Sequence, residues 1–264
     1  MASKIKYLFC INTGRSGSHY LSSIFDHVAN AISEHEMKPI GHSEVMRQFL
    51  KGNPEPMREL SEERLKLIQE KCTNGEVFIE TSHIFIKGYG WFFADNIPQE
   101  EIGVIILNRD KEKVVSSLER IGCKPLEHRG QNWIMTPAMK SPIIAAPKLT
   151  FLSAQMSFSV LSALSNFTKK TLSLFEKINL PLFKYPYFFE KYNRQCLAWY
   201  YDETFAQAQK FKDHFPNIHF YHAQINDLNN IDELQKLLDF FQLELTNDLK
   251  SIIGKPTNLK NKTS

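Results

Sequence analysis

The chain has 264 residues, of which 42% are hydrophobic and 23% are charged, and its formal net charge is +3. These values are typical of a globular protein with its own core, and the charge is too small to indicate a nucleic-acid partner. No apolar stretch reaches the length of a membrane span, and the amino-terminal residues lead into an apolar segment without the pattern of a signal peptide.

The four cysteines lie far apart in the sequence and form no CxxC pair; they are Cys10, Cys72, Cys123 and Cys196. This spacing predicts neither a disulfide framework nor a zinc site. We therefore expect a reducing compartment, the cytoplasm, and no bound metal.

A strand, a glycine-containing loop and a helix are predicted at the start of the chain. The apolar run Tyr7–Asn12 predicts a buried strand, and apolar residues at helical spacing predict a helix from Ser18 to about Asn30. The connecting loop has the sequence Gly14-Arg15-Ser16-Gly17-Ser18.

This loop has the composition of a phosphate-binding cradle. Gly14 and Gly17 allow backbone conformations in which amide groups point at an anion, and the following helix adds the positive end of its dipole. Arg15 adds a forked cation in place of the Gly-Lys-Ser/Thr of a Walker-A loop, which favours a phosphate-bearing donor other than ATP. Further side-chain donors are Ser16, Ser18 and His19. The alternative is a glycine turn whose serine only caps the helix.

The remaining predicted strands and helices alternate along the chain. Apolar runs predict strands at Glu76–Glu80, Gly103–Leu107 and Asn217–Tyr221. Helical patterns occur at Glu62–Lys71, Lys111–Ile121, Arg194 to about Lys212, and Ile231–Phe241. The alternation predicts one α/β domain over residues 1–264, a three-layer sandwich with a central, mainly parallel sheet.

Two polar clusters are candidates for acid–base chemistry. Glu34, His35 and Glu36 follow the first predicted helix, and the segment Glu80-Thr81-Ser82-His83 ends a predicted strand. The carboxyl ends of parallel strands face one crevice, so these side chains have access to a common ligand. The alternative for the first cluster is a solvated, capped turn.

A second candidate phosphate motif follows the strand Gly103–Leu107. Arg109 stands at the end of this strand, and Ser117 lies eight residues later on the next predicted helix. The two side chains can converge on one phosphate, Arg109 through two N–H groups and Ser117 through its hydroxyl. The alternative is that Arg109 and Asp110 form a salt bridge and a helix cap.

The segment from about 122 to 190 interrupts the alternation and is predicted to be an insertion. Between His128 and Phe189 it is rich in aromatic and basic residues, and Glu176 is its only acidic residue. A helix is predicted around Thr150–Phe175. The insertion is either extra core with lysines that reach solvent, or a cap that binds an acceptor over the edge of the sheet.

Together, the two motifs resemble the sulfotransferase superfamily, whose donor is 3′-phosphoadenosine 5′-phosphosulfate (PAPS). Gly14-Arg15-Ser16-Gly17-Ser18 is similar to the 5′-phosphosulfate loop of carbohydrate and protein-tyrosine sulfotransferases. The segment Arg109–Ser117 resembles the 3′-phosphate motif, with Lys111 in place of its usual proline. The resemblance implies a P-loop nucleotide hydrolase-like fold with a helical insertion, and it implies that the two motifs and His19 hold the donor.

The resemblance also implies the chemistry. Arg15 would stabilise the leaving adenosine 3′,5′-bisphosphate (PAP), and Glu36 would be the general base for the acceptor, with His35, Glu34 and His83 as rivals. The implied acceptor is a small molecule or glycan with a hydroxyl or amine, and neither nucleic acid nor a metal is required. The alternatives are a P-loop kinase or NTPase and a non-catalytic nucleotide-binding module.

Overall fold

The computed structural model describes residues 5–125, 127–147, 185–246 and 253. It contains a five-stranded sheet whose neighbouring strands all pair in parallel, in the order β2-β3-β1-β4-β5. The strands are β1 (Tyr7–Ile11), β2 (Ala31–Glu34), β3 (Val77–Glu80), β4 (Ile102–Asn108) and β5 (His219–Gln224). The predicted α/β fold with a parallel central sheet is confirmed.

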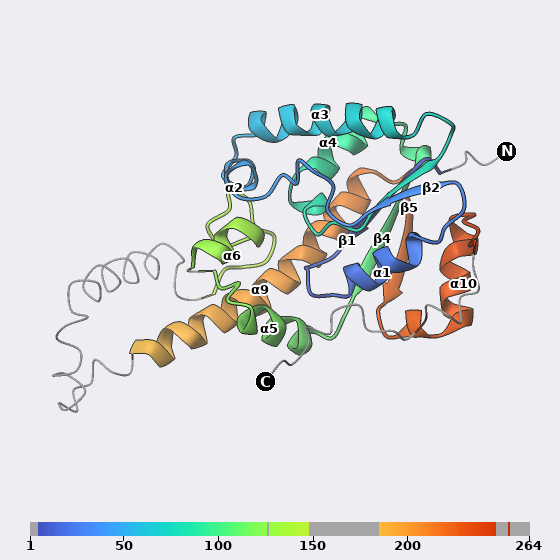
Figure 1. Ribbon diagram of the computed structural model, residues 1–264. Helices are drawn as coiled ribbons and strands as arrows, with labels where there is room; N and C mark the ends of the chain where they lie inside the picture. Colours follow the sequence, from blue (N-terminus) through green and yellow to red (C-terminus); the bar gives the residue numbers. More distant parts are fainter. Residues whose placement is uncertain (1–4, 126, 148–184, 247–252, 254–264) are drawn as a thin grey trace, which may run out of the picture.

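Helices cover both faces of this sheet (Figure 1). The α-helices are α1 (Ser18–Phe25), α2 (Glu44–Leu50), α3 (Glu55–Lys71), α4 (Tyr89–Asn96), α5 (Lys111–Arg120), α6 (His128–Trp133), α9 (Tyr185–His214) and α10 (Ile231–Phe240). Helices α1 and α10 pack on one face, whereas α3, α4 and the carboxyl-terminal half of α9 pack on the other. No helix in the described part of the chain is both long enough and apolar enough to cross a membrane.

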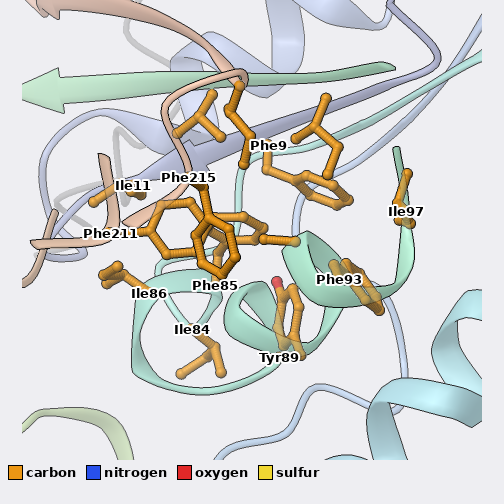
Figure 2. Packing of buried hydrophobic residues seen from close by; sticks show 14 of the residues in the cluster. Phe9, Ile11, Ile84, Phe85, Ile86, Tyr89, Phe93, Ile97, Phe211 and Phe215 are labelled. Carbon is orange, nitrogen blue, oxygen red and sulfur yellow. The ribbon is translucent and has the colours of Figure 1, made fainter. Parts of the chain in front are cut away.

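The side chains of β1 alternate between the two cores. Leu8 and Cys10 contact the core under α1 and α10, and Phe9 and Ile11 contact the opposite core. On that second face, Phe9 stacks on Phe85 with ring centroids 4.7 Å apart, within the aromatic cluster that Figure 2 shows. Because β1 is buried on both faces, the loop that follows it starts from a fixed position.

The first helix is shorter than the sequence predicted. It ends at Phe25, and Asn30 adopts a left-handed conformation before the edge strand β2 begins. The helical pattern continues past Phe25 because Val28 is also buried, but it is buried in the turn, where it forms a bridge with Leu245. Glu34 therefore lies in β2 and not in the turn considered as an alternative.

Other boundaries also differ from the prediction. Helix α3 begins at Glu55 and not at Glu62, and α9 begins at Tyr185, inside the range predicted to be an insertion. Strand β5 lies two to three residues later than expected, at His219–Gln224. The helix predicted around Thr150–Phe175 falls outside the described residues, so the single domain with an insertion at about 122–190 stays a prediction.

A buried ion pair ties α3 to the end of β3. Arg64 Nη2 donates to Glu80 Oε2 at 2.5 Å, and both side chains are almost fully buried. The other terminal nitrogen of Arg64 donates to the carbonyls of Met37 and Pro39, and Glu80 Oε1 accepts from the Met37 N–H at 3.0 Å. This pair thus fixes the segment that follows β2.

We expect Arg64→Met to lower the free energy of unfolding by about 3–5 kcal/mol, because it leaves Glu80 buried without a cation. Urea unfolding followed by circular dichroism measures the change. The double variant Arg64→Met/Glu80→Gln removes the stranded charge and should lose less stability than Arg64→Met alone. A loss below about 1 kcal/mol in the single variant, as for an exposed pair, would contradict this role.

Candidate functional site

A cavity of about 210 Å³ lies beyond the carboxyl ends of β1, β2 and β3, beside α5 and α6. Polar and charged side chains form one part of its lining: Thr13, Arg15, Ser18, His19, His35, Glu36, His83 and Arg129. Gly14 and a mainly apolar wall form the rest, the wall consisting of Leu118, Ile121, Cys123, Trp133 and Ile134. The cavity therefore gathers residues from the glycine loop and from both predicted polar clusters.

The glycine loop is held in left-handed conformations. The φ angles are +71° at Gly14, +59° at Arg15 and +96° at Gly17. A Cβ on Gly17 would lie 2.4 Å from the side chain of Ile225, so this position also requires glycine for space. Arg15 has no such freedom, and a non-glycine residue in this region marks a backbone that its surroundings must hold in place.

Hydrogen bonds inside the loop supply that support. Asn12 Oδ1 accepts from the Gly14 N–H at 2.8 Å. The hydroxyls of Thr13 and Ser16 lie 2.6 Å apart, and Ser16 is completely buried. The Ser16 hydroxyl therefore holds the loop together and does not line the cavity, unlike the neighbouring Ser18.

The two predicted phosphate motifs contact each other. Arg15 Nε donates to Ser117 Oγ at 3.1 Å, and Arg109 Nη1 donates to the Arg15 carbonyl at 2.7 Å. Two adjacent tyrosines of α9 hold both loops. The Tyr200 hydroxyl donates to the Thr13 carbonyl at 2.7 Å, and the Tyr201 hydroxyl donates to the Arg109 carbonyl at 2.8 Å. Residues 102 positions apart thus form one unit.

Four guanidinium groups gather at this unit: Arg15 and Arg109 belong to it, and Arg120 and Arg129 lie near Arg15. Burial, followed by the repulsion of the other three arginines, lowers the pKa of Arg15. Arg120 Nη2 lies 3.5 Å from Ser117 Oγ, the oxygen that Arg15 also contacts. None of the four forms an ion pair within the described residues, so their charge is available to an anion.

The two neighbours of Arg109 in the sequence have structural roles. Asp110 caps α5 by accepting from the Lys113 N–H at 2.9 Å, which is the helix cap considered as an alternative. Lys111 pairs with Asp202 of α9 at 2.5 Å. The lysine that replaces the usual proline therefore binds a carboxylate and is not an additional free cation.

Glu36 lies between two imidazole rings. Its Oε1 is 3.7 Å from His83 Nε2 and 3.8 Å from His35 Nε2, while the ring of His19 lies 3.7 Å from that of His35. Burial lowers the pKa of His35 to about 4 and that of His83 well below 6.5, so both rings are neutral at pH 7. Burial also raises the pKa of Glu36, and the charge of Lys87 opposes this rise.

The other acidic residues of the two polar clusters, and Ser82, do not line the cavity. Glu34 pairs with Lys71 at 2.5 Å, and Glu80 is bound by Arg64. Ser82 Oγ accepts from the N–H two residues later at 3.2 Å, so its hydroxyl stabilises the local turn.

Sequence reasoning missed three residues of this region: Lys87, Arg120 and Arg129. Lys87 is fully buried, with Nζ 2.5 Å from His83 Nδ1. The signal was its spacing of four residues from His83 and its place directly after the apolar run Ile84–Ile86. Arg120 and Arg129 follow Ser117 by 3 and 12 positions, a spacing that resembles an ordinary exposed helix surface.

No family model matches the sequence, and no curated protein matches it. A sulfotransferase domain from the curacin biosynthetic pathway is similar in structure, with a TM-score of 0.48 and 10% identity over 93% of this chain and 76% of that one. A sulfotransferase from Alicyclobacillus acidocaldarius has a TM-score of 0.45 and 13% identity over 92% and 82% of the two chains. At these identities the likeness says nothing of the chemistry of the site.

The depressed pKa of His35 makes stability depend on pH. Unfolded, this imidazole takes up a proton near pH 6.5, whereas folded it does so near pH 4. Between these values the unfolded chain binds more protons, so stability falls as the pH falls. We expect His35 to account for a loss of about 3 kcal/mol between pH 7 and pH 4.

Urea unfolding at a series of pH values measures this effect. His35→Gln should show a flatter dependence on pH than the unsubstituted protein, and the exposed His128→Gln serves as the matched control. Parallel pH curves for His35→Gln and the unsubstituted protein would show that the His35 pKa is not depressed.

Proposed function

We propose that this protein is a sulfotransferase that moves a sulfuryl group from PAPS to a hydroxyl or amine of an acceptor. The observation that carries the proposal is the cluster of four guanidinium groups around one glycine loop, with no carboxylate partner among the described residues. This cluster lies next to the cavity that holds Glu36. The arrangement supplies an anion site and a proton acceptor side by side.

The residues present fit a donor with two separate phosphate groups. The loop Gly14–Ser18 and Arg15 would hold the 5′-phosphosulfate, with His19 as a further donor. Arg109, Ser117 and Arg120 would hold the 3′-phosphate, because Arg120 and Arg15 both contact Ser117 Oγ and Arg109 donates to the Arg15 carbonyl. When bound, PAPS supplies an activated sulfuryl group and is released as PAP.

Arg15 would stabilise the negative charge that develops on the departing phosphate. Its guanidinium is already oriented by the bond from Nε to Ser117 Oγ, so no reorganisation is required at the moment of transfer. The left-handed backbone of Arg15 is held by Arg109 at its carbonyl. Positioning and electrostatic stabilisation are what these residues offer, and these are the two effects that dominate catalysis of phosphoryl transfer.

Glu36 is the proposed general base. Its raised pKa makes it a better proton acceptor than an exposed carboxylate, and it lines the cavity directly. The neutral rings of His35 and His83 flank Glu36 Oε1 and are the rival bases. In the proposed step, the acceptor hydroxyl gives its proton to the Glu36 carboxylate as the acceptor oxygen bonds to sulfur.

The acceptor is proposed to be a small molecule or a glycan. The wall formed by Leu118, Ile121, Trp133 and Ile134 offers apolar contact in the cavity that Glu36 lines, and Arg129 adds a charge there. All four cysteines are free thiols, which suits the reducing cytoplasm that we propose as the compartment.

Thermal denaturation with added nucleotides tests the proposed function. We expect PAP to raise the midpoint of unfolding and Mg-ATP to have no effect, because a ligand at 100 times its Kd adds about 2.7 kcal/mol of stability. Stabilisation by Mg-ATP but not by PAP would instead indicate a kinase or NTPase. A PAP response without sulfuryl transfer to any acceptor in a panel assayed with labelled PAPS would indicate a binding module.

We expect Arg109→Ala to weaken PAP binding by about 10- to 100-fold, because a charged hydrogen bond contributes roughly 1.5–3 kcal/mol. Isothermal titration calorimetry measures this Kd. Arg58→Ala on α3 removes the same charge at an exposed position and should leave the Kd nearly unchanged. Equal affinity in both variants would remove Arg109 from the donor site.

We expect Glu36→Gln to lower kcat by about 100-fold or more, since the amide cannot accept a proton from the acceptor. The Kd for PAP should stay close to that of the unsubstituted protein, because Glu36 is not part of the arginine cluster. Glu63→Gln, at an exposed position of α3, is the matched control for sulfuryl-transfer assays. Unchanged turnover in Glu36→Gln would move the base to His35 or His83.

A further inference from the structure

A buried lysine lies behind the imidazole of His83. Lys87 ends the short 3₁₀-helix η1 (Phe85–Lys87), and its side chain is completely buried. Its Nζ lies 2.5 Å from His83 Nδ1 and 2.7 Å from the Trp133 carbonyl oxygen, 4.8 Å from the centre of the Tyr200 ring. No carboxylate pairs with Lys87 among the described residues, so these two hydrogen bonds are its polar anchors.

The chemistry of the Trp133 carbonyl fixes one of these bonds. A carbonyl oxygen can only accept, so one N–H of Lys87 is used by Trp133. A charged Lys87 has only N–H groups left for His83, whereas a neutral amine has one N–H and a lone pair. Lys87 therefore donates to His83 Nδ1 when it is charged, and it can still donate when it is neutral. A neutral ring that accepts at Nδ1 carries its proton on Nε2.

The Nε2 atom of His83 faces Glu36, with Glu36 Oε1 at 3.7 Å. A proton on Nε2 thus points toward the carboxylate. We propose that Lys87 is a positioning residue that keeps the ring proton of His83 on Nε2, so that His83 presents an N–H group toward Glu36 and is not itself the base. The assignment of Glu36 as base rests on the proposed function, whereas the position of the ring proton is a property of the free protein.

Neighbouring ionisable groups favour a charged Lys87 and a neutral His83 ring. Burial lowers the pKa of Lys87 to about 7, while Cys123 and Glu36 favour its charged form. Burial lowers the pKa of the His83 ring, and Lys87, His35 and His42 lower it further. Lys87 in its charged form lowers the pKa of Glu36 and so keeps that carboxylate ionised.

The proton balance of the reaction leaves His83 and Lys87 unchanged. One proton passes from the acceptor hydroxyl to Glu36, the acceptor oxygen forms a bond to sulfur, and the bond from sulfur to the bridging phosphate oxygen breaks. The electron pair of the broken bond stays on the phosphate oxygen beside Arg15. His83 keeps its Nε2 proton throughout, and it neither gains nor loses a proton.

Nitrogen-15 NMR of the histidine rings in the ligand-free protein tests the proposal directly. His83→Gln identifies the His83 signals by their loss. At pH 7 we expect a neutral ring with the proton on Nε2. A ring protonated on Nδ1 only, or on both nitrogens, would overturn the proposal whether or not the protein binds PAP.

Lys87→Met provides the second arm, because methionine keeps the chain length but has no N–H to donate. We expect the His83 ring to lose its preference for the Nε2 proton and the Glu36 titration, followed by carbon-13 NMR, to move up by about one pH unit. Lys66→Met on the exposed face of α3 is the control for loss of one charge. A folded Lys87→Met with unchanged His83 and Glu36 signals would contradict the proposal.

The two experiments separate this inference from the proposed function. If PAP fails to stabilise the protein, the sulfotransferase assignment falls, while the NMR result still decides the role of Lys87. If Lys87→Met does not fold, the His83 signals of the unsubstituted protein decide it alone.

Discussion

The candidate site depends on one buried guanidinium, that of Arg64. This side chain binds Glu80 at the end of β3 and the carbonyls of Met37 and Pro39 in the segment after β2. Glu36 is adjacent to Met37 in the chain, so the ion pair fixes the backbone that presents the proposed base. A buried pair of this kind costs much desolvation free energy, and what it provides here is a defined position for a loop.

The anion site and the proton site are built on different supports. Arg15 and Ser117 are held through the glycine loop, α5 and the tyrosines of α9, whereas Glu36 is held through α3 and β3. The two supports meet at one cavity. Donors and charges that are oriented before a ligand arrives need little reorganisation, which is the condition for electrostatic catalysis. The left-handed backbone of Arg15 agrees with this view, since strained residues persist only where their surroundings over-determine them.

Local sequence patterns predicted the parts of the fold whose burial follows a simple period. Strand β4 reads as a continuous apolar run because it is buried on both faces, and it was predicted within a residue or two. The edge strand β2 has only half-buried residues, and it was missed because such a strand has neither a strong alternation nor an apolar run. Helix α1 was predicted to be too long, since Val28 is buried in a turn at a position that also suits a helix.

The sequence by itself determined the parallel α/β fold and the presence of a glycine loop with a forked cation, because both depend on residues close together in the chain. Tertiary structure alone decided which acidic residues are available. Glu80 and Glu34 bind Arg64 and Lys71, while Glu36 stays in the cavity between two histidines. It also placed Lys87 against His83 and Arg120 near Ser117. The physical reason is that the charge and pKa of a side chain depend on burial and on partners from distant segments, which no local pattern records.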